Sequence, residues 1–338
     1  MNSLSPDRKD GRQMTRKIAA PANDQAVGED LLSSAVDLAI RPKFELRRRA
    51  ISLQIYGWLL FLPAASLIVL FTHYPILTSF IGSLYSTPIG NNPADFVGLE
   101  NYSLMLSDPV FLKVLGNNFL FALGTIPVSV GIALLMAVLV NEKLPGRSFV
   151  RSAYFTPTIL PMVAAANFWL FFYTPDIGLF DQMFRSVGIA TPHWLGDPNT
   201  VLPSLMVMAI WKEAGFFMIF YLAALQNIPP ELRDAGRIEG AGRWRFFRRV
   251  TWPLLMPTTI FVLFNATINC FKLVDHLFIM TKGGPNNASS LLLYYIYEVA
   301  FSFWDTAYAS TLTMALLIVL SVLALSQFLY LERRAHYQ

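Results

Sequence analysis

Two adjacent charged residues, Lys212 and Glu213, lie about midway along an otherwise apolar run, residues 201–225. An unpaired charge at membrane depth is costly, so such residues usually face an internal cavity or a charge on a neighbouring element. Because adjacent residues on a helix point in different directions, Lys212 and Glu213 cannot share one face. The pattern predicts a polar position inside a membrane protein.

Residues for other kinds of chemistry are missing or scattered. The phosphate-binding loop of a nucleotide site needs a Gly-Lys pair, which does not occur in the sequence. If the protein uses ATP, we expect the ATP to bind to another subunit. There is also no G-x-S-x-G nucleophile motif. The four histidines are too far apart for a local metal motif, and the single cysteine, Cys270, excludes an internal disulfide. We expect no catalytic residue, metal site or cofactor in this chain.

The elements that must position these residues are membrane helices. The chain has 338 residues, of which 54% are hydrophobic and 14% charged, outside the range of a soluble protein. Five windows without Asp, Glu, Lys or Arg each exceed the roughly 20 residues that span a bilayer, namely 50–94, 114–141, 152–175, 250–271 and 306–331. The run 201–225 adds a sixth. The sequence predicts an all-α polytopic membrane protein with six transmembrane helices.

The basic residues are distributed by side of the membrane. The net charge is +4, and 21 of the 26 Lys and Arg lie before residue 51, at 142–151, at 228–250 or after residue 331. These places alternate with loops that are poor in Lys and Arg. The positive-inside rule therefore predicts that both termini and the 228–250 loop are cytoplasmic, and the charge is not a nucleic-acid signal. Residues 1–50 are predicted to be a disordered basic tail, and residues 51–338 the transmembrane domain.

An arginine-rich segment, residues 228–257, separates the fourth and fifth apolar runs. Pro229 and Pro230 can open a helix, because the first turn needs no amide donors. Glu231 and Asp234 follow where the positive end of the helix dipole favours carboxylates. The pattern predicts a short cytoplasmic helix within residues 229–242.

This short helix has features of a docking element. Helical spacing gives it a narrow apolar edge beside charged residues, formed by Leu232, Ala235 and Ile238. Gly240 can end the helix, because glycine adopts the left-handed conformation without a steric penalty. Such a helix could press into a groove on another protein.

The spacing of this segment resembles the EAA-x3-G-x9-I-x-L-P signature of permease subunits of binding-protein-dependent ABC importers. The matching residues are Asp234-Ala235-Gly236, Gly240 and Val250-Thr251-Trp252-Pro253. Three letters depart from the signature: Asp for Glu, Gly for the second Ala, and Trp for Leu. The phrases FVGLENY, HWLGDPN, LAALQNIPPEL and MTKGGPNNAS resemble the sugar and glycerol-phosphate branch of these permeases. The resemblance covers residues 50–338.

The resemblance implies that the short helix is the coupling helix, seated in a cleft of a cytoplasmic ATPase. The residues expected to couple the ATPase are Glu231, Asp234, Ala235, Arg237 and Gly240. Gly236 replaces the second alanine and leaves the stiffness of the helix open. The alternative is an interfacial helix held by lipid headgroups through the arginines that follow.

The resemblance also places candidate substrate-lining residues on two helices. They are Lys212, Glu213 and Phe216 on the fourth helix, and Ala266, Asn269, Cys270 and Leu273 on the fifth. Alternatively, Lys212 and Glu213 pair with other helices or with a second permease subunit. In many such heterodimers only one subunit contacts the substrate.

Together these features predict a multi-pass permease subunit of the bacterial inner membrane, resembling the MetI-like fold of type I importers. It would import a sugar or a polyol phosphate such as sn-glycerol 3-phosphate. The expected partners are membrane lipid, a second permease subunit, a cytoplasmic ATPase dimer and an extracytoplasmic solute-binding protein. ATP hydrolysis is expected in the separate ATPase subunit. The alternative is a secondary transporter driven by an ion gradient, which would need midplane carboxylates and inverted repeats.

Overall fold

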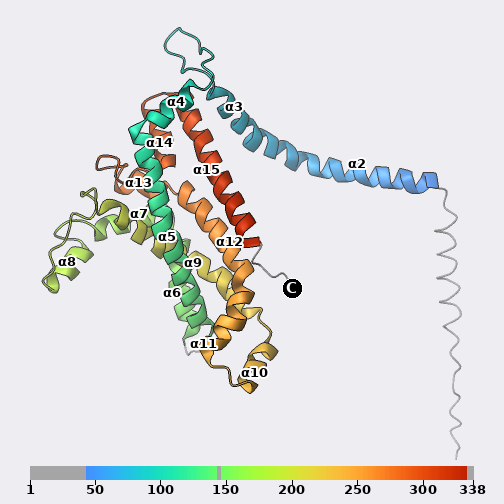
Figure 1. Ribbon diagram of the computed structural model, residues 1–338, viewed down its shortest axis with the longest axis vertical. Helices are drawn as coiled ribbons and strands as arrows, with labels where there is room; N and C mark the ends of the chain where they lie inside the picture. The colour runs from blue at the N-terminus through green and yellow to red at the C-terminus, as the bar shows by residue number, and fades with distance from the viewer. Residues whose placement is uncertain (1–42, 143–145, 333–338) are drawn as a thin grey trace, which may run out of the picture. The chain divides into compact units, whose positions relative to one another are not determined.

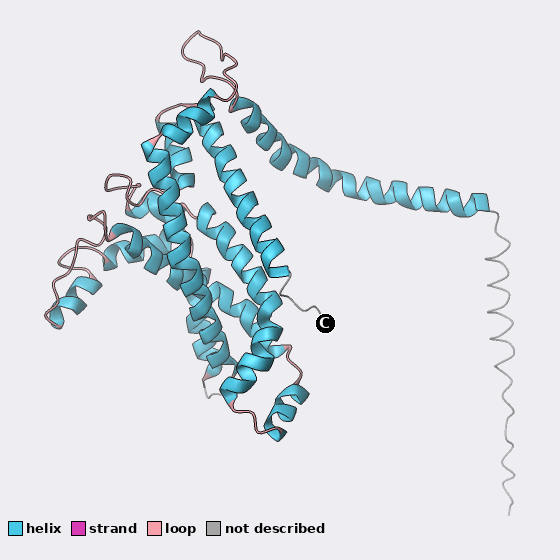
Figure 2. Cartoon of the chain, viewed as in Figure 1, coloured by secondary structure: helices cyan, strands magenta, loops and turns pink. Residues whose placement is uncertain are grey.

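The computed structural model describes residues 43–142 and 146–332. The chain divides into two compact units, Met1–Tyr74 and Pro75–Gln338. Helices joined by loops make up the described residues, and β pairing within them is limited to two isolated bridges (Figure 2). The predicted all-α fold class is confirmed.

The described residues contain six candidate membrane spans when one bent pair is counted as a single span. Five stretches of the described residues are long and apolar enough to cross a membrane: Gln54–Gly82, Pro109–Asn141, Val201–Gln226, Arg243–Met280 and Thr306–Leu329. The sixth is a pair of helices, α6 (Arg147–Ile159) and α7 (Met162–Phe172). The number of predicted spans is confirmed, but the third is not a single straight helix.

In the first unit, α2 (Lys43–Ile68) continues into the π-helix η1 (Val69–His73), and α3 (Tyr74–Gly82) follows in the chain. Residues 43–50, which the sequence analysis assigned to the tail, are the first turns of α2. Apart from Phe44, this stretch consists of the good helix formers Lys, Glu, Leu, Arg and Ala, and it leads directly into the apolar run. The prediction of a disordered tail at residues 1–42 lies outside the described residues.

The described part of the second unit contains four long helices: α5 (Pro109–Asn141), α9 (Val201–Gln226), α12 (Trp252–Lys272) and α15 (Thr306–Glu332). Figure 1 shows α5 and α15 running along the bundle, and α5 packs along α9 while α12 packs on α5, α9 and α15. On α5 a stripe of small buried residues, Ser129, Ala133 and Ala137, recurs every four positions. Small residues let helix backbones approach closely in a membrane, which supports this packing.

The core of the second unit lies where α5, α9 and α12 meet. Its largest fully buried side chains include Phe121 on α5, Leu205, Met208, Phe217 and Tyr221 on α9, and Leu255 and Phe271 on α12. Helix α5 begins at Pro109, upstream of the predicted apolar run 114–141, because the Asp108 carboxylate accepts the Val110 N–H at 2.8 Å and caps it. The helices that carry the predicted site are therefore firmly held together.

The third span is broken at Leu160-Pro161. Both residues have extended backbone conformations, and α6 and α7 meet at an angle of 100°. Proline has no N–H to donate and cannot continue a helix without a kink, so the break falls before Pro161. Pro157, the first proline of this span, lies inside α6. The bend therefore occurs at the second of the two prolines, Pro161.

Shorter helices connect the long ones: α4 (Glu100–Ser107), α8 (Leu179–Ser186), α10 (Pro230–Ile238), α11 (Arg243–Phe246), η2 (Phe247–Thr251), α13 (Asp275–Met280), α14 (Leu292–Tyr297) and η3 (Glu298–Ser302). The segment 86–113, before the predicted apolar run 114–141, contains α4 and the start of α5. The fifth span is longer than predicted, because α11 and η2 extend α12 towards α10.

Candidate functional site

The predicted coupling segment is an exposed helix at one end of the bundle, α10 (Figure 1). Pro230 is its first residue, Glu231 lies in its first turn, and Arg237 lies in its last turn. None of its residues is buried, and the apolar side chain of Ile238 is 88% exposed. Gly240 has φ +69°, the left-handed conformation that terminates the helix. A short exposed helix therefore lies within residues 229–242, and its cytoplasmic location stays a prediction.

Polar residues on α10 currently contact each other. The Arg237 guanidinium lies 3.4 Å from the Asp234 carboxylate, and both side chains are largely exposed. Such an exposed pair adds little stability, so either group can exchange its partner at low cost. Ala235 is exposed on the same helix. The side chains of these residues are exposed and lie outside the bundle core.

Gly236 has a local explanation that sequence reasoning missed. A Cβ atom at this position would lie 2.7 Å from Cδ2 of Phe246, which belongs to α11. Real Cβ atoms do not approach other atoms so closely, so glycine allows the Phe246 ring to pack directly on α10. The departure from the signature therefore coincides with a contact between α10 and the segment that returns to the membrane.

Five of the seven candidate substrate-lining residues surround one cavity between α5, α9 and α12. They are Glu213, Ala266, Asn269, Cys270 and Leu273. Across this cavity Asn269 Nδ2 donates a hydrogen bond to Glu213 Oε2 at 3.1 Å. The structure thus brings together predicted residues that are far apart in the sequence.

Helix α5 contributes residues to this cavity that sequence reasoning did not name. Phe121, Thr125 and Ser129 line it, together with Ala209 and Phe217 of α9. The Thr125 hydroxyl is buried and has no hydrogen-bond partner among the described residues. Small polar residues four positions apart in an apolar helix, as at Thr125 and Ser129, are a signal that could have identified this face of α5.

The cavity is too small for a sugar. Its volume is about 10 Å³, which is enough for about one water molecule. Sites for small-molecule ligands usually have volumes of about 300 Å³ or more. A solute can therefore be accommodated here only after α5, α9 and α12 separate or against residues of another subunit.

Lys212 and Phe216 do not line this cavity. The Lys212 ammonium donates to the carbonyl oxygens of Pro157 at 3.1 Å and Leu160 at 2.6 Å, at the break between α6 and α7. Phe216 packs against Phe217 and Phe220 on its own helix. Lys212 and Glu213 thus point to different neighbours, as expected for adjacent residues on a helix.

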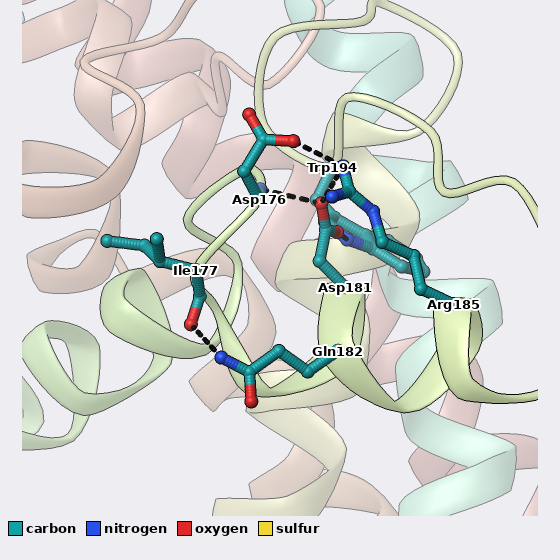
Figure 3. Close-up of polar contacts among 6 residues, drawn as sticks. All are labelled: Asp176, Ile177, Asp181, Gln182, Arg185 and Trp194. Carbon is teal, nitrogen blue, oxygen red and sulfur yellow. Dashed lines mark hydrogen bonds and ion pairs between the residues drawn. The ribbon is translucent and has the colours of Figure 1, made fainter.

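A second polar cluster lies in the segment between α7 and α9 (Figure 3). The Asp181 carboxylate accepts hydrogen bonds from the Asp176 backbone N–H and from the Trp194 indole, each at 2.8 Å. These two hydrogen bonds, the first more than the second, lower the pKa of Asp181. Arg185 pairs with Asp176, and Gln182 Nε2 donates to the Ile177 carbonyl at 3.0 Å. These contacts are local to the segment, so we interpret them as fixing its conformation.

The chain matches a known protein family. The profile of the binding-protein-dependent transport system inner membrane component family matches residues 129–337. The lactose transport system permease protein LacF of Rhizobium radiobacter is 32% identical over 280 residues, which are 81% of this chain and 93% of that protein. The sn-glycerol-3-phosphate transport system permease protein UgpA of Agrobacterium fabrum is 31% identical over 285 residues, 84% of this chain and 97% of that protein.

Solved structures agree on the fold. A chain of a bacterial ABC transporter involved in the import of the acidic polysaccharide alginate superposes with a TM-score of 0.75 and 21% sequence identity. The match covers 84% of this chain and 98% of that chain. A related structure, a bacterial alginate ABC transporter in complex with an alginate-pentasaccharide-bound periplasmic protein, gives a TM-score of 0.74 at 20% identity and covers 82% and 94% of the two chains.

Proposed function

This chain belongs to the binding-protein-dependent transport system inner membrane component family and is a permease subunit of an ABC importer. From that premise we propose that helix α10 couples ATP hydrolysis in a separate subunit to the import of the cargo. The observation that carries the proposal is α10, an exposed helix joined to α9 by only residues 227–229. A displacement of α10 would be transmitted directly to the span that carries Lys212 and Glu213.

The coupling helix engages a cytoplasmic ATPase dimer. In this proposal Glu231, Asp234 and Arg237 make polar contacts with the ATPase, while Ala235 lets the helix approach its cleft closely. Gly240 supplies the tight turn after the helix, because its φ of +69° is unfavourable for other residues. The exposed Asp234–Arg237 pair supports this role, since it can be exchanged for contacts with the partner.

The cargo passes between this chain and a second permease subunit. We place Glu213 and Asn269 in contact with the solute, beside Ala266, Cys270 and Leu273, once the small cavity opens. The volume of about 10 Å³ supports this, because a single closed chain offers no sugar-sized space at that position. Lys212 and Phe216, also expected at the pathway, can face it only in another conformation or from the subunit interface.

The cargo class follows from the relatives. Two of them are named for lactose and sn-glycerol 3-phosphate transport, so the proposed cargo is a sugar or a polyol phosphate. A solute-binding protein outside the membrane would deliver it. ATP binding would close the ATPase dimer, and hydrolysis in that separate subunit would restore the inward-facing state. The chain is a multi-pass protein of the inner membrane, and both termini are proposed to be cytoplasmic.

Uptake by the reconstituted complex tests this function. Proteoliposomes are assembled from the permease, its partner permease, the ATPase and the binding protein. The ligand that co-purifies with the binding protein is identified, and its radiolabelled form is used as the cargo. We expect uptake that requires ATP and persists when ion gradients are dissipated. Uptake that continues without ATP and collapses with the proton gradient would instead establish a secondary transporter.

Substitutions in α10 test the coupling role. Asp234→Arg reverses a charge and Gly240→Asp strains the left-handed turn, so both are expected to reduce co-purification of the ATPase by at least about tenfold, a factor that corresponds to one or two lost polar contacts. The matched control is Asp95→Arg, a charge reversal at an exposed aspartate outside this segment. Membrane insertion should be unchanged in all three variants. Wild-type assembly of the α10 variants would refute the coupling role.

A further inference from the structure

The break between α6 and α7 leaves backbone carbonyls that need a donor. In a continuous helix the carbonyl of Pro157 would accept the N–H of residue 161, but proline at 161 has none. At membrane depth an unsatisfied carbonyl is costly, because lipid offers no hydrogen-bond donor. A broken span therefore has to find donors from neighbouring elements.

Lys212 of α9 supplies that donor. Its ammonium donates to the Pro157 carbonyl oxygen at 3.1 Å and to the Leu160 carbonyl oxygen at 2.6 Å. Both carbonyls belong to the last turn of α6 or to its C-cap residue, Leu160. The C-terminal end of a helix carries a partial negative charge, which attracts a cation. The Lys212 ammonium therefore stabilises these two carbonyl groups by its charge as well as by hydrogen bonding.

The backbones of α6 and α9 also fit closely at this place. Gly215 lies three residues after Lys212, and a Cβ atom there would be only 2.3 Å from the Tyr154 carbonyl oxygen. The Thr158 hydroxyl donates back to the Lys212 carbonyl at 3.5 Å, a long contact. Residues three apart share one face of a helix. One face of α9 is thus shaped to hold the end of α6.

We infer that Lys212 is a positioning residue that caps the α6–α7 break and fastens it to α9, so that movement of the coupling helix α10 is conveyed to the broken span. The chain path supports this, because α9 ends at Gln226 and α10 begins at Pro230. Glu213 on the neighbouring face contacts Asn269 of α12. The two adjacent charges therefore connect α9 to two different partners. The transport role of this contact rests on the proposed coupling function.

The first experiment measures thermal unfolding of the purified complex carrying Lys212→Met, Lys212→Arg or the control Lys272→Met. Lys272 is an exposed lysine at the end of α12, so its replacement removes the same charge without removing a cap. We expect Lys212→Met to lower the unfolding midpoint and Lys212→Arg to restore it, because arginine also donates to carbonyls. Lys272→Met should match the wild type. A wild-type midpoint for Lys212→Met would overturn the inference.

A double variant tests the missing N–H itself. Pro161→Ala provides a backbone donor and allows α6 to continue as a helix, so the Pro157 carbonyl no longer depends on the lysine. Lys212→Met should therefore be much less destabilising in the Pro161→Ala background than in the wild type, a coupling expected only for residues that share an interaction. Equal, additive effects in the two backgrounds would overturn the capping role.

Uptake kinetics separate positioning from substrate binding. With the cargo identified on the binding protein, we expect Lys212→Met to lower the maximal uptake rate by about tenfold while the half-saturating concentration changes less than about twofold. A large rise in half-saturation with a normal unfolding midpoint would make Lys212 a substrate ligand instead. The unfolding experiments remain decisive even if the wild-type complex imports no solute, so failure of the proposed function and failure of this inference can be distinguished.

Discussion

At the scale of single residues, Gly236 shows how a departure from a family signature can be understood from its neighbours. The sequence alone left the stiffness of the coupling helix open, because glycine replaces the second alanine. In the structure the Phe246 ring occupies the space that a Cβ atom would need, with Cδ2 only 2.7 Å from it. We interpret the pair as a direct packing contact between α10 and α11. Small size, and not flexibility, is then what the position requires.

Gly236→Ala should therefore weaken coupling, although alanine is the residue that the signature prefers there. Overpacking of this kind costs about 1–3 kcal/mol, and about 1 kcal/mol corresponds to a factor of about five in assembly. Co-purification of the ATPase and ATP-driven uptake would measure the effect. Adding Phe246→Leu, which removes the ring, should restore both.

Gly242→Ala is the matched control, because nothing lies within 4 Å of its Cβ position and its φ of −63° suits alanine. It should behave as the wild type. A normal Gly236→Ala variant, or one that Phe246→Leu fails to rescue, would contradict the packing interpretation.

At the scale of helices, Asp108 joins three elements at one end of the bundle. Its carboxylate caps α5 by accepting the Val110 N–H at 2.8 Å, and it accepts hydroxyl hydrogen bonds from Tyr295 of α14 at 2.8 Å and Tyr308 of α15 at 2.7 Å. Burial raises the pKa of Asp108, but these hydrogen bonds, that of Tyr308 first, outweigh burial and lower it. Asp108 is therefore ionised at neutral pH.

Asp108→Ala should destabilise the second unit by about 2 kcal/mol or more, because a helix cap and two hydrogen bonds to a charged acceptor are lost together. Thermal unfolding in detergent measures the change. The native stabilisation should be fully present above the usual aspartate pKa of 3.8 and should be lost only as the pH falls through the lower folded-state value.

Ser107→Ala is the control, since this exposed hydroxyl donates only to carbonyls of its own helix, at Ser103 and Leu104. If both variants unfold at the same temperature, Asp108 does not join these helices in the way that the structure indicates.

Sequence patterns predict some features of these helices and not others. Apolar runs located the spans, because hydrophobicity over about 20 residues is a local property. They did not locate the start of α5, since the Asp108 cap involves only a few residues. They did not show where the third span breaks or which side chain donates hydrogen bonds to its freed carbonyls. That donor, Lys212, is distant in sequence and becomes a neighbour only through the packing of α6 on α9.

At the scale of the whole molecule, the distribution of basic residues predicts the orientation in the membrane. Four basic places alternate with loops poor in Lys and Arg, so both termini and the 228–250 loop are expected on the cytoplasmic side. The segment between α7 and α9, which contains α8, is expected on the opposite side. Its local network around Asp181 gives that segment a defined conformation.

Reporter fusions test this orientation. Green fluorescent protein fused at the C-terminus should fluoresce, because it folds in the cytoplasm. Alkaline phosphatase inserted at Gly188, an exposed turn residue with φ +74°, should be active because it requires the extracytoplasmic side. Inserted at Gly242 in the predicted cytoplasmic loop, the same enzyme should be inactive. The reverse pattern of activities would contradict the orientation.

The sequence by itself determined the membrane class, the six spans and the family, because hydrophobic length and the spacing of the α10 segment are properties of short stretches of chain. It also named five residues that the structure gathers around one cavity. Only the tertiary structure decided that Lys212 and Glu213 have different partners, that Thr125 and Ser129 belong to the same cavity, and that Phe246 fills the space beside Gly236. These relations depend on which helix faces pack against each other, and a local sequence pattern does not specify the packing partner.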